Sequence, residues 1–370
     1  MNVDWLIVGA GLTGLTIAER MATTRGASVL VVDRRSHVAG NAWDAYNEHG
    51  IREHRYGPHI FHTNSEEVWQ YLSRFTAWRP YVHRVLGSVE GQLVPLPFNL
   101  DSLDRLYPAA AARRLTMKLL GGFATGTSVP ILKLRQHDDA EIRDLADFVY
   151  RNVFEQYTMK QWALRPEELA PSVTARVPVV LSRDDRYFRD TWQAIPRDGY
   201  AAMAARMLDN PNIRVLLDTS WQDIKNVVRW KRLVFTGAID EFFEYRYGAL
   251  PYRTLHFERQ TLPMERFQAA AVINYPNAPG LTRVTEHKWL SGQSHSHTTV
   301  VTEYPRAHEV GITVPYYPVP TDANRQLYRR YAHDAAAMGP DTTFVGRLAD
   351  YTYFNMDQAV ARALRAVRNA

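Results

Sequence analysis

The N-terminal 33 residues contain the pattern that most constrains the fold of this chain. An apolar run at 5–8 leads into Gly9-Ala10-Gly11-Leu12-Thr13-Gly14, a helical stretch follows, and the apolar segment SVLVVD ends at Asp33. In such a segment Gly9 permits a tight turn, Gly11 lets a pyrophosphate approach the backbone, and Gly14 lets the helix pack closely on the strand. The pattern predicts a Rossmann-type βαβ unit that binds a dinucleotide.

The position of Asp33 supports this interpretation. Asp33 follows Gly14 by 19 residues, close to the ~20 expected for an acidic residue that accepts hydrogen bonds from a ribose. A glycine turn without such an acid is weak support for dinucleotide binding. The motif by itself does not distinguish NAD from FAD.

Composition excludes several other classes of function. The chain has no cysteine, which excludes disulfides, thiolate catalysis and cysteine-ligated metals. The net charge is +5, but the basic residues are spread along the chain, so we expect no nucleic-acid partner. No apolar run reaches the ~18–20 residues of a membrane span. We therefore expect a soluble, cytoplasmic protein without a membrane partner.

The patterns after the βαβ unit predict an α/β fold with three domains. The dinucleotide-binding domain is expected to be discontinuous, an antiparallel β-sheet domain to be formed by two segments, and a helical domain to be inserted between them. The dinucleotide-binding domain is predicted at 1–80, 190–240 and 312–370. The sheet domain is predicted at 81–99 and 241–311, and the helical domain at 100–189. Within 81–98 a hairpin is predicted, with its turn at Glu90-Gly91.

The helical region contains a group of aromatic residues. Phe154 and Tyr157 are three residues apart on a predicted helix and would share a face, and Trp162 precedes a proline-containing stretch that leads to Arg176. Aromatic faces beside an arginine-bearing loop suit a base and a diphosphate. Core aromatics followed by a connecting loop explain the same residues equally well.

Two further segments carry candidate site residues. The segment RYGPHIFHT (55–63) holds His59 and His62, which either line the cofactor or lie in an ordinary loop; no ligand spacing favours a metal. The segment GRLADYTYFNMDQ (346–358) reads as an extended stretch followed by a helix. Alternation would place Tyr351 and Tyr353 on one face of that stretch.

Taken together, these segments resemble the UDP-galactopyranose mutase family of the bacterial type. The motifs VGAGLTG, DRRSHVAGNAWD, YGPHIFHT, FEQYTMKQW, TGAIDEFFEYRYGALPYRTLHF, VINYPN and GRLADYTYFNMDQ occur in the family's order along the chain. The resemblance implies a Rossmann-like FAD-binding domain and the interconversion of UDP-galactopyranose and UDP-galactofuranose without net oxidation. It implies that FAD works in its reduced form, with flavin N5 attacking the anomeric carbon and displacing UDP. It also implies a homodimer.

The resemblance implies roles for individual residues. The residues expected to contact FAD are Gly9, Gly11, Leu12, Thr13, Gly14, Asp33, Arg34, Gly40, Asn41, His59, His62, Arg347, Met356 and Asp357. The residues expected to bind UDP-galactose are Phe154, Tyr157, Thr158, Trp162, Tyr187, Phe188, Asn274, Tyr317, Tyr353 and Asn355. The catalytic residues implied are Arg176 and Arg283, which would hold the diphosphate, and His59 beside flavin N5. The resemblance also implies that Arg176 lies on a mobile substrate lid of the helical domain.

The chain departs from the family pattern at two positions. Ala39-Gly40 stands where two glycines are common, and Asn355 stands where an aspartate is common, which puts a proton-transfer role at that position in question. Two other functions fit the nucleotide-binding fingerprint. One is a flavin oxidoreductase similar to amine oxidases, in which paired arginines for a diphosphate have no purpose. The other is a non-enzymatic carrier similar to the proteins that bind prenylated GTPases, which would hold no flavin.

Overall fold

The computed structural model describes residues 1–169 and 178–368. The chain divides into two compact units. Unit 1 comprises Met1–Tyr81, Asp190–Tyr252 and His308–Ala370, and unit 2 comprises Val82–Arg189 and Arg253–Ala307. The division into three domains stays a prediction.

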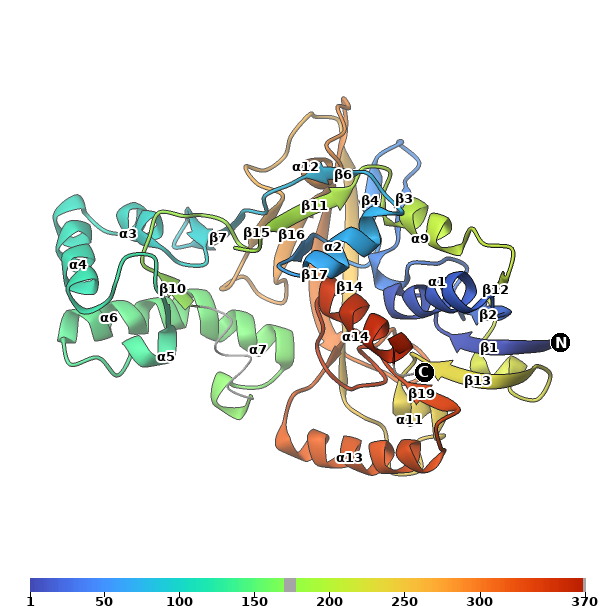
Figure 1. Cartoon of the computed structure of the whole chain (residues 1–370). Helices are drawn as coiled ribbons and strands as arrows, with labels where there is room; N and C mark the ends of the chain where they lie inside the picture. Colours follow the sequence, from blue (N-terminus) through green and yellow to red (C-terminus); the bar gives the residue numbers. More distant parts are fainter. Residues whose placement is uncertain (170–177, 369–370) are drawn as a thin grey trace. The chain divides into compact units, whose positions relative to one another are not determined.

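A parallel sheet forms the centre of unit 1 (Figure 1). Its strands lie in the order β12 (Ile213–Leu216), β2 (Val29–Val32), β1 (Asn2–Val8), β13 (Arg229–Phe235) and β19 (Thr342–Phe344), and each neighbouring pair is parallel. All four residues of β2 are buried, as expected for a parallel strand covered on both faces. The predicted Rossmann-like unit is confirmed.

Helices pack on this sheet and on one another. Helix α1 (Leu12–Arg25) packs on β1, β2 and β12, and α14 (Met356–Arg368) and α9 (Tyr200–Leu208) pack on α1 (Figure 1). An apolar cluster that includes Leu6, Leu30 and Phe235 lies on the sheet. Helix α11 (Ile239–Phe242) contacts α13 (Asp322–Ala337).

The smaller elements of unit 1 complete its framework. A three-stranded antiparallel sheet has the order β5 (Phe61–Thr63), β11 (Trp192–Pro196) and β6 (Trp78–Pro80). Strands β3 (Asp44–Tyr46) and β4 (Arg52–His54) form a separate pair. The remaining helices of this unit are α2 (Glu66–Ser73), α10 (Trp221–Ile224) and the 3₁₀ helix η1 (Gly40–Ala42); the short strand β18 spans Tyr317–Pro318.

Unit 2 is built on a mostly antiparallel sheet. Its strands lie in the order β14 (Tyr252–Leu262), β17 (Thr298–Ala307), β16 (Arg283–Glu286), β15 (Val272–Asn274), β7 (Val85–Val89) and β8 (Gln92–Leu96). Only the β15–β7 pair within this series is parallel. The predicted hairpin is confirmed, because β7 and β8 pair around Glu90 and Gly91, which both have positive φ.

The described residues of unit 2 also form several helices. They are α3 (Leu100–Leu106), α4 (Ala109–Gly122), α5 (Ile131–Leu134), α6 (Ala140–Val149), α7 (Gln156–Trp162), α12 (His287–Ser291) and the 3₁₀ helix η3 (Pro166–Glu168); β9 (Ser128–Pro130) pairs with β10 (Pro178–Val180). Helices α4 and α5 both pack on α6. Between α6 and α7 the chain forms a π-helical segment, η2 (Tyr150–Glu155). None of the helices among the described residues has the length and apolar character needed to cross a bilayer.

Candidate active site

Packing within the protein requires glycine at two of the three glycine positions in the turn after β1, but not at the third. Gly9 has φ +109°, and a Cβ there would lie 2.0 Å from Thr236 Oγ1. A Cβ at Gly14 would lie 2.0 Å from the carbonyl oxygen of Gly9. At Gly11, by contrast, the nearest atom to a Cβ is Gly40 Cα at 3.9 Å, an ordinary contact distance. Packing within the protein therefore requires glycine at 9 and 14, whereas a Cβ at 11 would make only an ordinary contact with Gly40.

Asp33 is fixed by backbone hydrogen bonds at the end of β2. Its Oδ2 accepts from the Ala10 N–H at 2.8 Å, and its Oδ1 accepts from the Arg35 N–H at 2.9 Å. Each carboxylate oxygen can accept a further hydrogen bond. The side chain thus closes the glycine turn and keeps the capacity to accept a hydrogen bond from a ligand.

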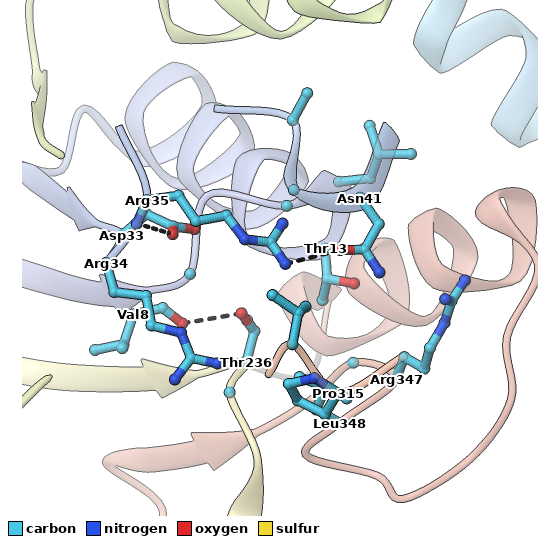
Figure 2. Close-up of a pocket in the computed structure, with 18 of the residues that line it drawn as sticks. Val8, Thr13, Asp33, Arg34, Arg35, Asn41, Thr236, Pro315, Arg347 and Leu348 are labelled. Carbon is cyan, nitrogen blue, oxygen red and sulfur yellow. Dashed lines mark hydrogen bonds between the residues drawn. The ribbon is translucent and has the colours of Figure 1, made fainter. Parts of the chain in front are cut away.

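Both features lie in one pocket of unit 1, at the carboxyl ends of β1, β2 and β13 (Figure 2). This edge is where open parallel sheets bind their ligands. The predicted cofactor residues that line the pocket are Gly9, Gly11, Leu12, Thr13, Asp33, Arg34, Gly40, Asn41, His59, Arg347 and Met356. Gly14, His62 and Asp357 are outside this set: Gly14 packs against Gly9, and Asp357 accepts a hydrogen bond from Thr63.

Other pocket residues were not predicted. Thr219, Ser220 and Trp221 enter from the start of α10, where Ser220 and Asp223 form a reciprocal capping box. The sequence DTSWQD carries that capping signal, but nothing in it indicates proximity to the glycine turn. Thr236 follows β13, and its hydroxyl donates to the Val8 carbonyl at 2.9 Å (Figure 2).

Ala39 and Gly40 both adopt left-handed backbone conformations in the pocket wall. Their φ values are +70° and +57°. A Cβ at Gly40 would lie 2.9 Å from Gly11 Cα, so the second position of the pair needs glycine. At Ala39 the chain tolerates an alanine in the same conformation, at a cost of about 1–2 kcal/mol relative to the right-handed region.

The segment before α14 is a turn, and its predicted extended conformation is wrong. Tyr351 has φ +44°, is buried, and donates its hydroxyl to the Pro251 carbonyl at 2.5 Å. Tyr353 instead stacks on Tyr317, with ring centroids 5.6 Å apart. The guanidinium of Arg347 lies 5.5 Å from the Tyr353 ring and donates to the Phe354 carbonyl at 2.9 Å. Asn355 directly precedes α14, and its N–H donates to Gln358 Oε1.

The two candidate histidines have different surroundings. His59 lines the pocket, and its Nδ1 lies 2.8 Å from the Gly57 carbonyl. Because a carbonyl only accepts, Nδ1 is the donor in this contact. His62 lies in β5, with Nδ1 2.8 Å from Asp190 Oδ2. The described residues contain no group of histidines and carboxylates that could hold a metal ion.

The remaining predicted substrate residues that the structure describes lie in unit 2. Phe154 is buried in η2 against Tyr150, and Thr158 is buried on α7. Tyr157 and Trp162 on α7 are half-buried. Since the π-helical geometry extends through Phe154, the spacing assumed for an α-helix does not hold between Phe154 and Tyr157.

Tyr187 and Phe188 form an aromatic pair of their own in unit 2. Their rings meet edge to face at 5.0 Å, and Phe188 stacks on His83. Arg176, and with it the predicted lid, lies outside the described residues.

Arg283 and Asn274 are neighbours in the sheet of unit 2. They are paired residues of β16 and β15. Arg283 forms a two-point ion pair with the buried Glu303, with Nε–Oε2 and Nη2–Oε1 distances of 2.9 Å each. Asn274 Oδ1 is buried and has no hydrogen-bond partner among the described residues. A buried acceptor without a partner is costly.

Comparison with known proteins identifies the family. A family model described as UDP-galactopyranose mutase matches residues 152–353, and one described as NAD(P)-binding Rossmann-like domain matches residues 7–75. A probable UDP-galactopyranose mutase from Klebsiella pneumoniae is 34% identical over 98% of this chain and 94% of its own length. A dTDP-fucopyranose mutase from Escherichia coli is 33% identical over 98% of this chain and 97% of its own length.

Solved structures show the same fold. The crystal structure of a reduced UDP-galactopyranose mutase has a TM-score of 0.76 at 14% identity, covering 100% of this chain and 94% of that chain. A putrescine oxidase structure has a TM-score of 0.58 at 12% identity, covering 100% of this chain and 99% of the other. With the family model matching more than half of the chain and relatives above 30% identity over nearly all of it, the chain belongs to the UDP-galactopyranose mutase family.

Proposed function

We propose that this enzyme interconverts UDP-galactopyranose and UDP-galactofuranose with FAD as its cofactor. The observation that carries the proposal is the match of residues 152–353 to the mutase family, a stretch that includes Arg283, Tyr157 and Trp162. The pocket of unit 1 supports the cofactor assignment, because Gly11 leaves room for a pyrophosphate and Asp33 presents carboxylate oxygens.

FAD, bound in its reduced form, would supply flavin N5 as the nucleophile at the anomeric carbon, so that the sugar changes ring size without net oxidation. The protein's part is to bind and orient the reactants. Asp33 would accept hydrogen bonds from the adenosine ribose, and the first turn of α1 would face the pyrophosphate. Arg347 and His59, which line the same pocket, would contact the flavin. The N-terminus of α14 at Met356 would favour negative charge on the reduced cofactor.

On the substrate side, each proposed contact follows the chemistry of UDP. Tyr157 would stack on uracil beside Phe154, Thr158 and Trp162, and the Asn274 oxygen would accept a hydrogen bond from the base. Arg283 and Arg176 would hold the diphosphate as charge develops on it. The guanidinium of Arg283 is oriented in advance by Glu303.

A second candidate substrate is a dTDP-fucose. The relative named dTDP-fucopyranose mutase is as similar to this chain as the relative named UDP-galactopyranose mutase. The two nucleotides differ at the 2′-hydroxyl of the ribose and the 5-methyl group of the base, and the sugars differ at C6. Each difference is small enough to depend on one or two side chains.

The test is anaerobic turnover with both furanose substrates. Purified protein is reduced with dithionite, incubated with UDP-galactofuranose or dTDP-fucofuranose, and product is followed by chromatography against an unreduced control. We expect conversion of the UDP-sugar only under reduction. A higher kcat/KM with dTDP-fucofuranose would reassign the substrate, and no conversion of either sugar by flavin-loaded protein would refute mutase activity.

Oxygen consumption in the unreduced sample would favour the oxidoreductase alternative. The predicted homodimer is tested by sedimentation equilibrium.

A further inference from the structure

Lys160 makes an unusual set of contacts in unit 2. It lies on α7 between Tyr157 and Trp162, and its ammonium donates to three backbone carbonyls: Tyr275 at 2.6 Å, Ala278 at 2.8 Å and Leu281 at 2.6 Å. An ammonium has three donors, so all of them are used. Burial lowers the pKa of this group to about 8, while three carbonyl acceptors favour its charged form.

The three carbonyls belong to the turn that joins β15 to β16. Residues 275–282 form this turn, which is closed at its base by the Tyr275 N–H donating to the Thr282 carbonyl at 2.9 Å. Asn274 and Arg283, the paired residues next to the turn, flank it directly. Lys160 therefore links α7 to the turn between these two residues.

Arg253 fixes the same end of α7 from β14. Its guanidinium donates from Nε to the Gln161 carbonyl at 2.9 Å and from Nη2 to the Lys160 carbonyl at 3.2 Å. Arg253 is buried. These two carbonyls lie in the last turn of α7, where helical acceptors have no intrahelical donor. Helix α7 is thus held by one cation on β14 and holds the β15–β16 turn with another.

The contacts of Lys160 therefore connect the two proposed halves of the nucleotide site. Tyr157 and Trp162, proposed for the base, lie on α7; Asn274 and Arg283, proposed for the base and the diphosphate, flank the turn. Water could satisfy the carbonyls of an isolated turn, and burying an ammonium costs free energy. What the ammonium adds is a fixed separation between the helix and the hairpin.

We propose that Lys160 is a positioning residue for the nucleotide, which sets the distance between the base-binding face of α7 and Arg283 through its contacts with the 275–281 carbonyls. This role rests on the proposed function, since it presumes a nucleoside diphosphate between these elements. Lys160 itself need not touch the substrate. Loss of its ammonium would let the hairpin move relative to α7 while both elements stay folded.

The experiment compares Lys160→Met, which keeps the length of the side chain and removes its donors, with Lys118→Met. Lys118 is the matched control, a lysine of the same unit that pairs with Asp139 and Glu141 on the surface. The readouts are the dissociation constant of UDP for the oxidised protein by calorimetry, KM and kcat for UDP-galactofuranose, the flavin spectrum and thermal unfolding. UDP binding needs no turnover, so it is measured independently of mutase activity.

We expect Lys160→Met to weaken UDP binding and raise KM roughly tenfold or more, with the flavin spectrum and FAD content unchanged. Lys118→Met should stay within twofold of the wild type. Lys160→Arg retains a cation that cannot reach three converging carbonyls in the same way, and should lie between the two. This variant also provides the test if Lys160→Met does not fold.

Two results would overturn the proposal. If Lys160→Met, or Lys160→Arg in its place, lowers the melting temperature but keeps the UDP dissociation constant and KM within twofold, Lys160 only stabilises the fold. If the wild-type protein binds no UDP at all, the proposed function fails and this role fails with it. Weakened UDP binding in a protein that shows no mutase turnover would support the positioning role and count against the activity.

Discussion

The two units hold their candidate ligand-binding residues by different means. In unit 1 the pocket is shaped by backbone: Gly9, Gly14 and Gly40 stand where a Cβ would collide with neighbouring atoms, and Asp33 is held by two backbone N–H groups. In unit 2 the corresponding residues are held by buried or half-buried charged side chains. Glu303 orients Arg283, and Lys160 and Arg253 fix α7.

This difference determines how each unit should respond to substitution. A backbone-shaped pocket tolerates changes on its open side and fails where packing is tight. A site held by charged side chains is sensitive to the loss of a single cation, because the group left behind is buried without its partner. The predictions below test this contrast, beginning with the largest expected effect.

The largest effect is expected from Arg283→Ala in unit 2. If Arg283 holds the diphosphate as proposed, turnover should fall by about 10³-fold or more, because the bidentate contact to the developing charge would be lost, while FAD content stays normal. Activity assays and the flavin absorbance per protein measure the two quantities. The exposed Arg306 of the same unit provides the control, as Arg306→Ala. Arg283→Ala leaves the buried Glu303 without its ion-pair partner. The double variant Arg283→Met/Glu303→Gln removes both charges, so it should fold and remain inactive. Near-normal turnover in either variant would disprove the diphosphate role.

The next prediction distinguishes a glycine of unit 1 that ligand binding is expected to require from one that packing requires. Gly11→Val should give folded protein that purifies without flavin, because Gly11 lines the pocket and a Cβ there makes no contact with the protein shorter than 3.9 Å. Gly14→Val should fail to fold, because its Cβ would lie 2.0 Å from a backbone oxygen. Circular dichroism, thermal unfolding and flavin absorbance distinguish the two outcomes. Full FAD content in Gly11→Val would contradict the assignment of this pocket.

Unit 1 also contains a buried carboxyl, Asp240, which forms no ion pair within the part of the chain that the structure describes. It is 2% exposed, its Oδ2 accepts from the Leu250 N–H at 2.8 Å, and burial raises its pKa to about 6. The folded protein therefore binds this proton more tightly than the unfolded chain, so the contribution to stability is full below about pH 4 and is lost as the pH rises through about 6. Asp240→Asn should raise the free energy of unfolding at pH 7–8 by roughly 1–3 kcal/mol and flatten its slope between pH 4 and 6.

Urea unfolding of both proteins at several pH values measures this effect. An unchanged slope in the variant would show that another group titrates in this range. A loss of stability at all pH values would show that the asparagine amide is not accommodated. Asp240 would then resemble the charged residues of unit 2, whose loss is expected to be damaging.

The smallest effect is expected at Ala39. Ala39→Gly relieves the left-handed strain but increases the entropy of the unfolded chain, so the net gain in stability should be below about 1 kcal/mol. Ala42 lies in the same segment but does not have a positive φ, so it serves as the control. Ala42→Gly should lower the stability of the protein. Thermal unfolding at one pH compares the two, and a loss of stability in Ala39→Gly would contradict the strain.

The sequence predicted the elements whose determinants are local. The glycine spacing and Asp33 indicated the pocket of unit 1, and Glu90-Gly91 indicated the β7–β8 hairpin, because each depends on backbone conformations that few residues adopt. The conformation of Tyr351 could not be predicted in this way. Its hydroxyl donates to the carbonyls of Pro251 and Val319, which are distant in the chain, whereas simple alternation suggested an extended segment.

The charged contacts of unit 2 were equally inaccessible from the sequence. Lys160 stands within a helical pattern where an exposed lysine is ordinary, and its carbonyl partners lie more than 100 residues away. Substrate roles for this unit came from the family resemblance and stay predictions until tested. The π-helical segment was also missed, because its residues read as a continuous amphipathic helix from α6 into α7.

That π-helical segment carries one residue more than a regular α-helix would need over the same rise, because its hydrogen bonds run from residue i to i+5. The extra residue is absorbed within the wide turn, so the helices on either side keep their phase. Deleting one residue of η2 is therefore expected to leave Tyr157, Lys160 and Trp162 on the same side, whereas deleting one residue from the α-helical turn just before Lys160 would rotate Lys160 and Trp162 by about 100°. In an alignment, a one-residue gap at 150–155 is compatible with the same face of α7, and a gap within α7 is not.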